Sequence, residues 1–335
     1  MGLTRSKKIK RIGLIGLGSI GRRHLRLIKE LRPDVEVFVV RSGRGLKCIE
    51  EALADGIVYS MDQLEGLSID AAIISSPASY HVDQALKLVG LGIPLLVEKP
   101  LSHNLDKTQD LMELTESSRV CALVGYVFRH SEDLNYFQKV VTDSQAGPFS
   151  EVRIVCSSYL PEWRPGQDYF ESVSAKVNLG GGVLLELSHE LDYANWLFGP
   201  FESIEASIIN SGLLQLEVED TADLMLMSRN GLSVSIHIDF VSKHPVRECM
   251  IEGVTGYFHW DGIKCAVGSQ SSSGCFKVKE FDDNRDQMYR SQLSHFMACV
   301  EQGIQPKVSL DEGIEVLKLI DAAKRSSQEK SVVFL

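Results

Sequence analysis

The chain has 335 residues, of which 44% are hydrophobic and 24% charged, and its formal net charge is −10. This length exceeds one ordinary hydrophobic core, so we expect a globular protein with two domains. The negative charge argues against general nucleic-acid binding, which requires basic surfaces. No apolar stretch reaches the roughly 18 residues needed to span a membrane. Seven scattered cysteines show neither CxxC nor zinc spacing. We therefore expect a soluble, cytoplasmic protein with free thiols and no metal site.

The first third of the chain, from residue 9 to residue 125, alternates short apolar runs with helix-like segments. This alternation predicts right-handed crossovers and a parallel sheet covered on both faces, which is a doubly wound α/β domain. The expected strands are 12–15, 35–40, 57–59, 71–75, 94–97 and 120–124, and the expected helices are 22–31, 46–55, 80–91 and 105–117.

A glycine pattern follows the first expected strand and opens the first expected helix. The residues are Gly16, Gly18, Ser19, Ile20 and Gly21, in the spacing GxGxxG. The first glycine permits the tight turn, the second lets a pyrophosphate approach the backbone, and the third lets the helix pack against the strand. The free N–H groups of the helix terminus favour phosphate. A bound dinucleotide is predicted, against the alternative of a plain structural turn.

The end of the second expected strand bears on the choice of nicotinamide cofactor. NAD-binding units usually carry an acidic residue there, which binds the ribose 2′-hydroxyl. This chain instead has Arg41, Ser42 and Arg44. Two guanidinium groups and a hydroxyl can hold a 2′-phosphate, so we expect NADP(H) to be preferred over NAD(H). The alternative interpretation is a solvated basic loop.

The pattern changes to period-two alternation after about residue 150. Such alternation is typical of an antiparallel sheet with one covered face. The expected domains are therefore 1–126, which binds the dinucleotide, and 127–335, an α+β substrate domain with an open, mostly antiparallel sheet. An open sheet face commonly packs against another subunit, so we expect a homodimer or homotetramer. The expected strands are 151–160, 203–210, 220–228, 231–242, 246–253 and 275–281, and the expected helices are 183–198, 286–302 and 310–326.

Lys99 is a candidate for proton transfer. The tripeptide Glu98-Lys99-Pro100 follows an expected strand. Ligands of open α/β sheets bind at the carboxyl ends of strands. A lysine there can exchange a proton with a substrate hydroxyl or carbonyl when its pKa is lowered. Read alone, the tripeptide is also ordinary surface composition.

The expected helix 183–198 gathers polar side chains opposite an apolar stripe. His189 and Trp196 fall almost opposite the stripe, and Asp192 and Tyr193 flank them. His189 and Asp192 are three residues apart and can meet. A histidine beside a carboxylate suits proton transfer near neutral pH. The alternative is a solvated helix face with a structural histidine.

A segment rich in aromatic residues lies between the two patterns. Trp163, Arg164 and Tyr169 occur within the sequence YLPEWRPGQDY. Aromatic faces suit a sugar ring, and a guanidinium suits a carboxylate or phosphate. A rigid surface loop is the other interpretation.

An ordered set of motifs resembles the Gfo/Idh/MocA oxidoreductase family over almost the whole chain. The motifs are GLGSIGRRH at 16–24, SSPASYH at 75–81, EKPLS at 98–102, GYVFR at 125–129, GGVLLELSHELDYANWLFG at 181–199 and SQLSHFMACVEQG at 291–303. The resemblance implies a two-domain NAD(P)-dependent enzyme that oxidises a secondary alcohol, or reduces the carbonyl, of sugars, inositols and related compounds without a metal.

The resemblance also assigns roles to residues. It implies Lys99 and His189 as proton-transfer residues, without saying which of them moves the proton. It places Ser76, Pro77, His81 and Glu98 near the cofactor. Asp192 resembles a substrate-binding or histidine-orienting group, and GYVFR adds Tyr126 and Arg129 as substrate-binding candidates alongside Trp163, Arg164, Tyr169 and Tyr193.

Two further points concern specificity. Many family members carry an acid four residues before the histidine, where this chain has Leu185, and its acid is Glu186. The segment WRPGQDY resembles a subset found with surface-glycan pathways, which implies a nucleotide-linked or acidic sugar. The alternatives to the enzyme are a non-catalytic dinucleotide sensor and a reductase of a non-sugar carbonyl compound.

Overall fold

The computed structural model describes residues 8–43, 47–143, 148–254, 256–271 and 274–335. The chain divides into two compact units. The first contains the chain up to Val127 together with Arg285–Ile314, and the second contains Phe128–Asn284 and Glu315–Leu335.

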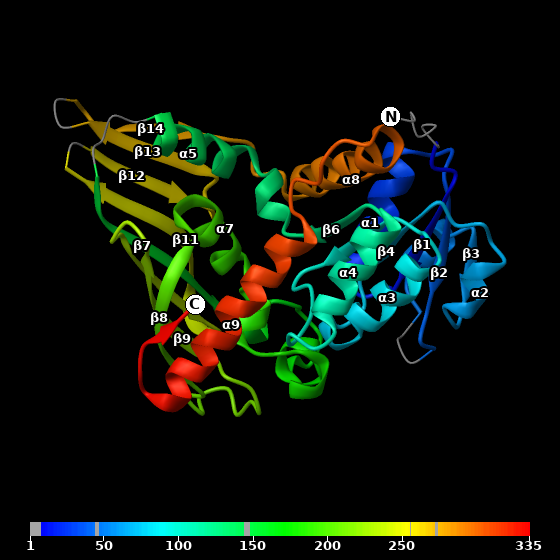
Figure 1. Cartoon of the computed structure of the whole chain (residues 1–335), viewed down its shortest axis with the longest axis horizontal. Coiled ribbons are helices and arrows are strands. Elements are labelled where there is room, and N and C mark those ends of the chain that lie inside the picture. Colours follow the sequence, from blue (N-terminus) through cyan, green and yellow to red (C-terminus); the bar gives the residue numbers. More distant parts are fainter. Residues whose placement is uncertain (1–7, 44–46, 144–147, 255, 272–273) are drawn as a thin grey trace. The chain divides into compact units, whose positions relative to one another are not determined.

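The first unit is built on a six-stranded parallel sheet with the order β3-β2-β1-β4-β5-β6, drawn in blue and cyan in Figure 1. Its strands are almost wholly apolar because helices cover both faces. The strand order reverses between β1 and β4, which is where such sheets bind ligands. The strands are β1 (Arg11–Ile15), β2 (Glu36–Val40), β3 (Gly56–Val58), β4 (Ala71–Ile74), β5 (Leu95–Glu98) and β6 (Ala122–Gly125).

The helices of this unit are α1 (Ser19–Leu31), α2 (Asp62–Glu65), α3 (His81–Gly90), α4 (Thr108–Ser118) and α8 (Arg285–Gln302). The helix expected at 46–55 was wrong in type, because only a 3-10 helix forms, over Ile49–Leu53. Asp55 has to reach β2, where its carboxylate accepts the N–H of Val37 at 2.6 Å and contacts Lys29 at 2.5 Å. Leu46, the expected first residue of that helix, lies outside the described residues.

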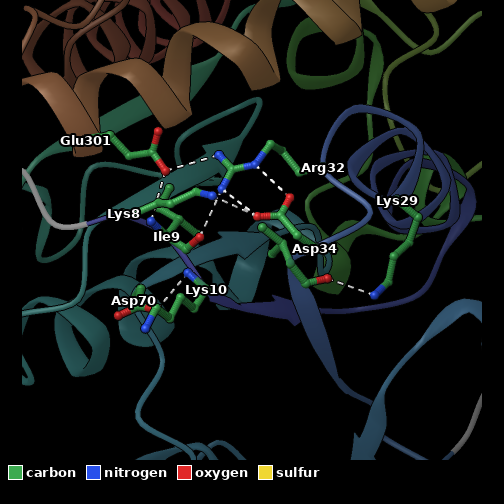
Figure 2. Close-up of polar contacts among 9 residues, drawn as sticks. Lys8, Ile9, Lys10, Lys29, Arg32, Asp34, Asp70 and Glu301 are labelled. Atoms are coloured by element: carbon green, nitrogen blue, oxygen red, sulfur yellow. Dashed lines mark hydrogen bonds and ion pairs between the residues drawn. The ribbon is translucent and has the colours of Figure 1, made fainter.

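Helix α8 packs in the first unit although sequence analysis assigned it to the second domain. Its apolar residues Leu293, Phe296 and Met297 join the same buried cluster as Leu25 and Ile28 of α1. Figure 2 shows the polar part of this contact, in which Glu301 accepts from Arg32 at 3.1 Å and from the N–H of Ile9 at 2.9 Å. A single boundary at residue 126 therefore does not describe how the chain divides.

The second unit is an open nine-stranded sheet with the order β14-β13-β12-β11-β7-β10-β9-β8-β15. All neighbouring strands are antiparallel except β7 and β10, so the expected α+β fold is confirmed. The strands are β7 (Phe149–Tyr159), β8 (Phe201–Ile209), β9 (Thr221–Ser228), β10 (Ser233–Asp239), β11 (Val241–Gly253), β12 (Gly256–Asp261), β13 (Ala266–Ser271), β14 (Lys277–Glu280) and β15 (Val333–Phe334).

Helices α5 (Glu132–Asp143), α7 (His189–Phe198) and α9 (Leu310–Glu329) accompany this sheet in Figure 1, and the short helix α6 (Val183–Glu186) precedes α7 in the chain. The strand expected at 231–242 is two strands, because the Asp239 carboxylate accepts the N–H groups of Val241 and Ser242 and turns the chain. Ser309 caps the last helix, since Ser309 and Glu312 accept each other's N–H groups. Within the described part of the chain, no helix combines the length and apolarity that a membrane crossing needs.

Candidate functional site

The turn between β1 and α1 fits the diphosphate of a dinucleotide. Gly16 has φ +92°, and a Cβ there would lie 2.8 Å from the Ser75 carbonyl oxygen. A Cβ on Gly21 would lie 2.3 Å from the Gly16 carbonyl oxygen, whereas one on Gly18 would meet nothing within 4 Å. Gly16 and Gly21 are thus required by the fold itself, and Gly18 leaves open space above the turn.

The first turn of α1 faces that space with its backbone N–H groups. The helix begins at Ser19 and Ile20, and its N-cap residue Gly18 provides no side-chain cap. The opening amides of a 13-residue helix therefore stay available for an anion, which the helix dipole also favours.

At the end of β2, Arg41 is less available to a ribose 2′-phosphate than the sequence predicted. Arg41 forms an ion pair with Glu51, and only 11% of its side chain is exposed. Ser42 is exposed, and Arg44 lies outside the described residues. A carboxylate beside Arg41 competes with a 2′-phosphate for the guanidinium group.

His81 ties together the segments that follow β4 and β5. Its Nδ1 lies 2.9 Å from the carbonyl oxygen of Pro100, and its Nε2 lies 2.7 Å from that of Ser76. Burial lowers the pKa of His81, a residue that is 1% exposed. The Ser76 hydroxyl donates to Gln84 at 2.7 Å, and half-buried Pro77 precedes the turn that leads into α3. These expected cofactor residues therefore lie at the carboxyl end of the sheet.

Lys99 follows directly on β5 at this same edge and is half-buried. The carboxylate of the preceding residue, Glu98, lies 2.6 Å from Nε2 of His24 on α1. The other oxygen of that carboxylate accepts the N–H of Lys99 at 3.3 Å. Both oxygens of the Glu98 carboxylate are thus engaged by residues of the first unit.

In the second unit, α6 and α7 replace the single helix expected at 183–198. A turn at Leu187 and Ser188 interrupts the helix, so His189 begins a new one. His189 is 8% exposed and Asp192 is 1% exposed, which excludes the alternative of a solvated face.

The carboxylate of Asp192 is held by Arg129 in a bidentate ion pair. The Arg129 Nε and Nη2 atoms donate to the two oxygens at 2.9 and 3.1 Å. The guanidinium carbon lies 4.7 Å from the centroid of the Trp196 ring. Both partners are almost fully buried, and the pair fixes the face of α7 one turn after His189.

The His189 ring packs against Phe128, and the guanidinium group of Arg247 lies over the other ring. Phe128 stands edge-to-face with His189 at 5.0 Å between ring centroids. The Arg247 guanidinium lies 4.7 Å from the centroid of Phe128, and its Nε lies 2.9 Å from the buried carboxylate of Glu190.

The other substrate-binding candidates make contacts within the protein. Tyr193 is fully buried edge-to-face with Trp260, and burial raises its pKa. Trp163 donates to Ser158 at 3.1 Å, and the Tyr169 hydroxyl donates to the Leu214 carbonyl oxygen at 3.3 Å. Tyr126 is fully buried, whereas Arg164 is half-buried. Their roles toward a substrate stay predictions.

Sequence reasoning missed His24, Phe128, Glu190 and Arg247. A signal existed for His24, because it falls on the buried face of α1 with Gly21 and Ile28, where a polar residue is unusual. Glu190 and Arg247 are 57 positions apart and meet only in the folded unit, so no local pattern indicates their pairing.

The parallel sheet, the glycine turn and the uncapped helix define a dinucleotide-binding oxidoreductase fold with a separate open-sheet unit. The model of the oxidoreductase family with an NAD-binding Rossmann fold matches residues 10–126. The model of that family's C-terminal alpha/beta domain matches residues 151–335. The chain therefore belongs to the Gfo/Idh/MocA oxidoreductase family.

Relatives of known name are similar over most of the chain. Myo-inositol 2-dehydrogenase of Thermotoga maritima is 25% identical over 97% of this chain and 98% of its own length. Levoglucosan dehydrogenase, solved with NADH, has a TM-score of 0.86 at 16% identity, covering 97% of this chain and 98% of the other. The WlbA dehydrogenase of Bordetella pertussis, solved with NADH and UDP-GlcNAcA, has a TM-score of 0.81 at 22% identity, covering 98% and 99%.

Proposed function

We propose that the protein is an NAD(P)-dependent dehydrogenase or reductase that acts on a secondary alcohol or carbonyl of a sugar, an inositol or a sugar derivative. The observation that carries this proposal is the open glycine turn at β1 with Lys99 at the end of β5 in the same sheet. The names of the relatives, an inositol dehydrogenase and two sugar dehydrogenases, support this substrate class.

The nicotinamide, when bound, supplies or accepts the hydride. The residues Gly16–Gly21 and the first amides of α1 would hold the diphosphate of a bound dinucleotide. Lys99 exchanges a proton with the substrate oxygen as its carbon gains or loses hydride. His189, held on α7 of the second unit, is the other proton-transfer candidate, and either of the two residues can be the one that moves the proton. Arg129 and Asp192 support the helix that carries His189.

The test measures the absorbance of reduced nicotinamide with NAD⁺ and NADP⁺ against inositols, free hexoses and nucleotide-linked sugars with and without a carboxylate. Lys99→Ala is expected to lower turnover about 10²–10⁴-fold if Lys99 is a general acid–base. The matched control is Lys318→Ala, since Lys318 is exposed and forms a surface ion pair with Glu315.

His189→Ala is tested beside His244→Ala, which changes an exposed histidine of β11. Wild-type turnover in both Lys99→Ala and His189→Ala would contradict the catalytic assignment. Dinucleotide binding without turnover on any substrate would instead favour the sensor.

The cofactor preference is decided, in our proposal, at the end of β2. Arg41 and Ser42 stand where NAD enzymes usually carry an acid, which supports NADP(H). Arg41→Ala is expected to weaken NADPH binding about tenfold more than NADH binding, because only NADPH carries the 2′-phosphate. Glu51→Gln is expected to strengthen NADPH binding, because it removes a negative charge beside Arg41. Equal effects on both cofactors, measured by calorimetry, would contradict the preference.

We propose further that copies of the chain associate through the uncovered face of the nine-stranded sheet, as a homodimer or homotetramer. Met225 on β9 is 43% exposed there, and His237 and Arg153 line a shallow hollow on the same face. Sedimentation of the wild type and of Met225→Lys tests this, and a monomeric wild type contradicts it.

A further inference from the structure

We propose that the buried pair of His24 and Glu98 is a positioning element for Lys99. This inference rests on the proposed function, because it assigns the pair a role in presenting the proton-transfer residue. His24 stands three residues after Gly21 on the helix that begins at the dinucleotide turn, and Glu98 immediately precedes Lys99. The pair therefore connects the two parts of the proposed site within one unit.

The contact between the two side chains is short and shielded from water. His24 Nε2 lies 2.6 Å from Glu98 Oε1, with 0% of the histidine side chain and 8% of the glutamate side chain exposed. A buried carboxylate requires a hydrogen-bonding partner, and His24 provides it. This contact fixes the Glu98 side chain with respect to α1.

The second oxygen of Glu98 acts on Lys99 itself. Oε2 accepts the backbone N–H of Lys99 at 3.3 Å. A Cβ on Gly125, which pairs with Glu98 across β5 and β6, would lie 3.0 Å from the same oxygen. The carboxylate thus lies across the end of β6, where a glycine leaves room for it. Glu98 cannot turn away without releasing the backbone of Lys99.

The surroundings of the His24 ring away from Glu98 indicate that the histidine does more than fill space in the core. The ring stands edge-to-face with Tyr289 of α8, at 6.1 Å between centroids. Its Nδ1 is buried and has no hydrogen-bond partner among the described residues. A buried unpaired polar atom costs stability, so an apolar residue would serve packing alone at least as well. The hydrogen bond to Glu98 is what a histidine adds.

Loss of this bond is expected to slow catalysis without preventing cofactor binding. We expect His24→Leu to lower kcat by about tenfold to a hundredfold while the Kd for NADH changes by less than about threefold, because small displacements of a reacting group are costly. His24→Gln keeps an N–H that can reach Glu98 and is expected to recover most of the loss. Glu98→Gln keeps the shape of the side chain but has one acceptor oxygen in place of two, so it cannot accept from both His24 and Lys99 and is expected to lower kcat similarly.

The deciding measurement does not depend on turnover. Modification of lysines by trinitrobenzenesulfonate, followed by peptide mass spectrometry, gives the pH dependence of Lys99 labelling with Lys318 as internal reference. In His24→Leu the labelling of Lys99 is expected to change relative to Lys318, and in His24→Gln it is expected to return.

Unchanged Lys99 labelling and unchanged kcat in His24→Leu would overturn the inference. It would be overturned equally if kcat, the Kd for NADH and the melting temperature fell together and His24→Gln rescued none of them, because that describes a structural residue. A failure of the proposed function gives a different result from a failure of this inference. Lys99→Ala would then keep wild-type turnover, while the labelling of Lys99 would still show whether His24 and Glu98 position it.

Discussion

Each unit buries a carboxylate beside its proposed proton-transfer residue, and the two carboxylates are held in different ways. Glu98 in the first unit contacts a histidine and the backbone of Lys99 at the end of a strand. Asp192 in the second unit is bound by both ends of the Arg129 guanidinium, one helical turn after His189. The histidine holds its carboxylate through one ring nitrogen, whereas the guanidinium group of the arginine holds its carboxylate through two nitrogens.

The proposed site in the first unit is built mainly from backbone groups, whereas the one in the second unit is built mainly from side chains. In the first unit Gly18, the strand ends and the helix N-terminus supply most of the proposed contacts, so a loss there should affect ligand binding more than folding. In the second unit buried ion pairs maintain α7 itself. A loss there should affect folding first.

The largest expected effect comes from Asp192→Ala. Removing one partner leaves Arg129 buried and unpaired, which is expected to cost about 3–5 kcal/mol of unfolding free energy. The double change Arg129→Met with Asp192→Leu removes both charges and is expected to lose less than the single change.

Urea unfolding followed by tryptophan fluorescence measures the stability of the second unit, because Trp163, Trp196 and Trp260 all belong to it. The control is Asp321→Ala, whose exposed pair with Arg325 is expected to contribute less than about 1 kcal/mol. Equal stability of Asp192→Ala and this control would remove the distinction between the two units.

An intermediate effect is expected from the glycine turn. Gly18→Ala places a Cβ in open space, so folding should be unchanged, while the Kd for NADH should rise about tenfold as the methyl group meets the diphosphate. Gly21→Ala instead forces a Cβ to 2.3 Å from the Gly16 carbonyl oxygen and should lower the melting temperature as well. Calorimetry and thermal unfolding separate the two variants, and unchanged affinity in Gly18→Ala would show that the diphosphate lies elsewhere.

The smallest expected effect is a pH dependence on the sheet face of the second unit. Hydrogen bonds to Asp239 and Asp223 raise the pKa of His237 to about 9, from the 6.5 that is usual for histidine. A raised folded-state pKa means that the stabilisation is complete below pH 6.5 and is lost as the pH rises toward 9. His237→Asn should flatten that part of the stability profile, and an NMR titration of the His237 ring checks the cause. A ring that titrates near 6.5 would contradict it.

Much of the fold was predictable because its signals are local. The strands of the first unit are short apolar runs between turns, and the GxGxxG spacing fixes one turn by steric necessity. Lys99 and His189 were predicted from the EKPLS and GGVLLELSHELDYANWLFG motifs, the second of which departs from the family pattern at Leu185, and their roles stay predictions. The break at Leu187–Ser188 and the short helix at Ile49–Leu53 were not predictable, because tertiary contacts decide where those helices end.

The partners of the proposed site residues were harder to predict than the residues themselves. His24 is 74 positions from Glu98, and Arg129 is 63 positions from Asp192. The sequence shows which residues are polar on a buried face, but it does not pair them. The interpretation of Arg41 as free for a phosphate overlooked Glu51, ten residues later, for the same reason.

Because α8 belongs to the first unit, that unit cannot complete its fold until a late part of the chain has been synthesised. A nascent chain released only as far as residue 127 would expose Leu25 and Ile28, which α8 covers in the finished protein. Synthesis therefore reaches residue 314 before the dinucleotide unit can close its core. A fragment truncated at residue 127 is expected to aggregate, whereas a gene fusion of 1–127 to 285–314 through a flexible linker would carry the complete unit.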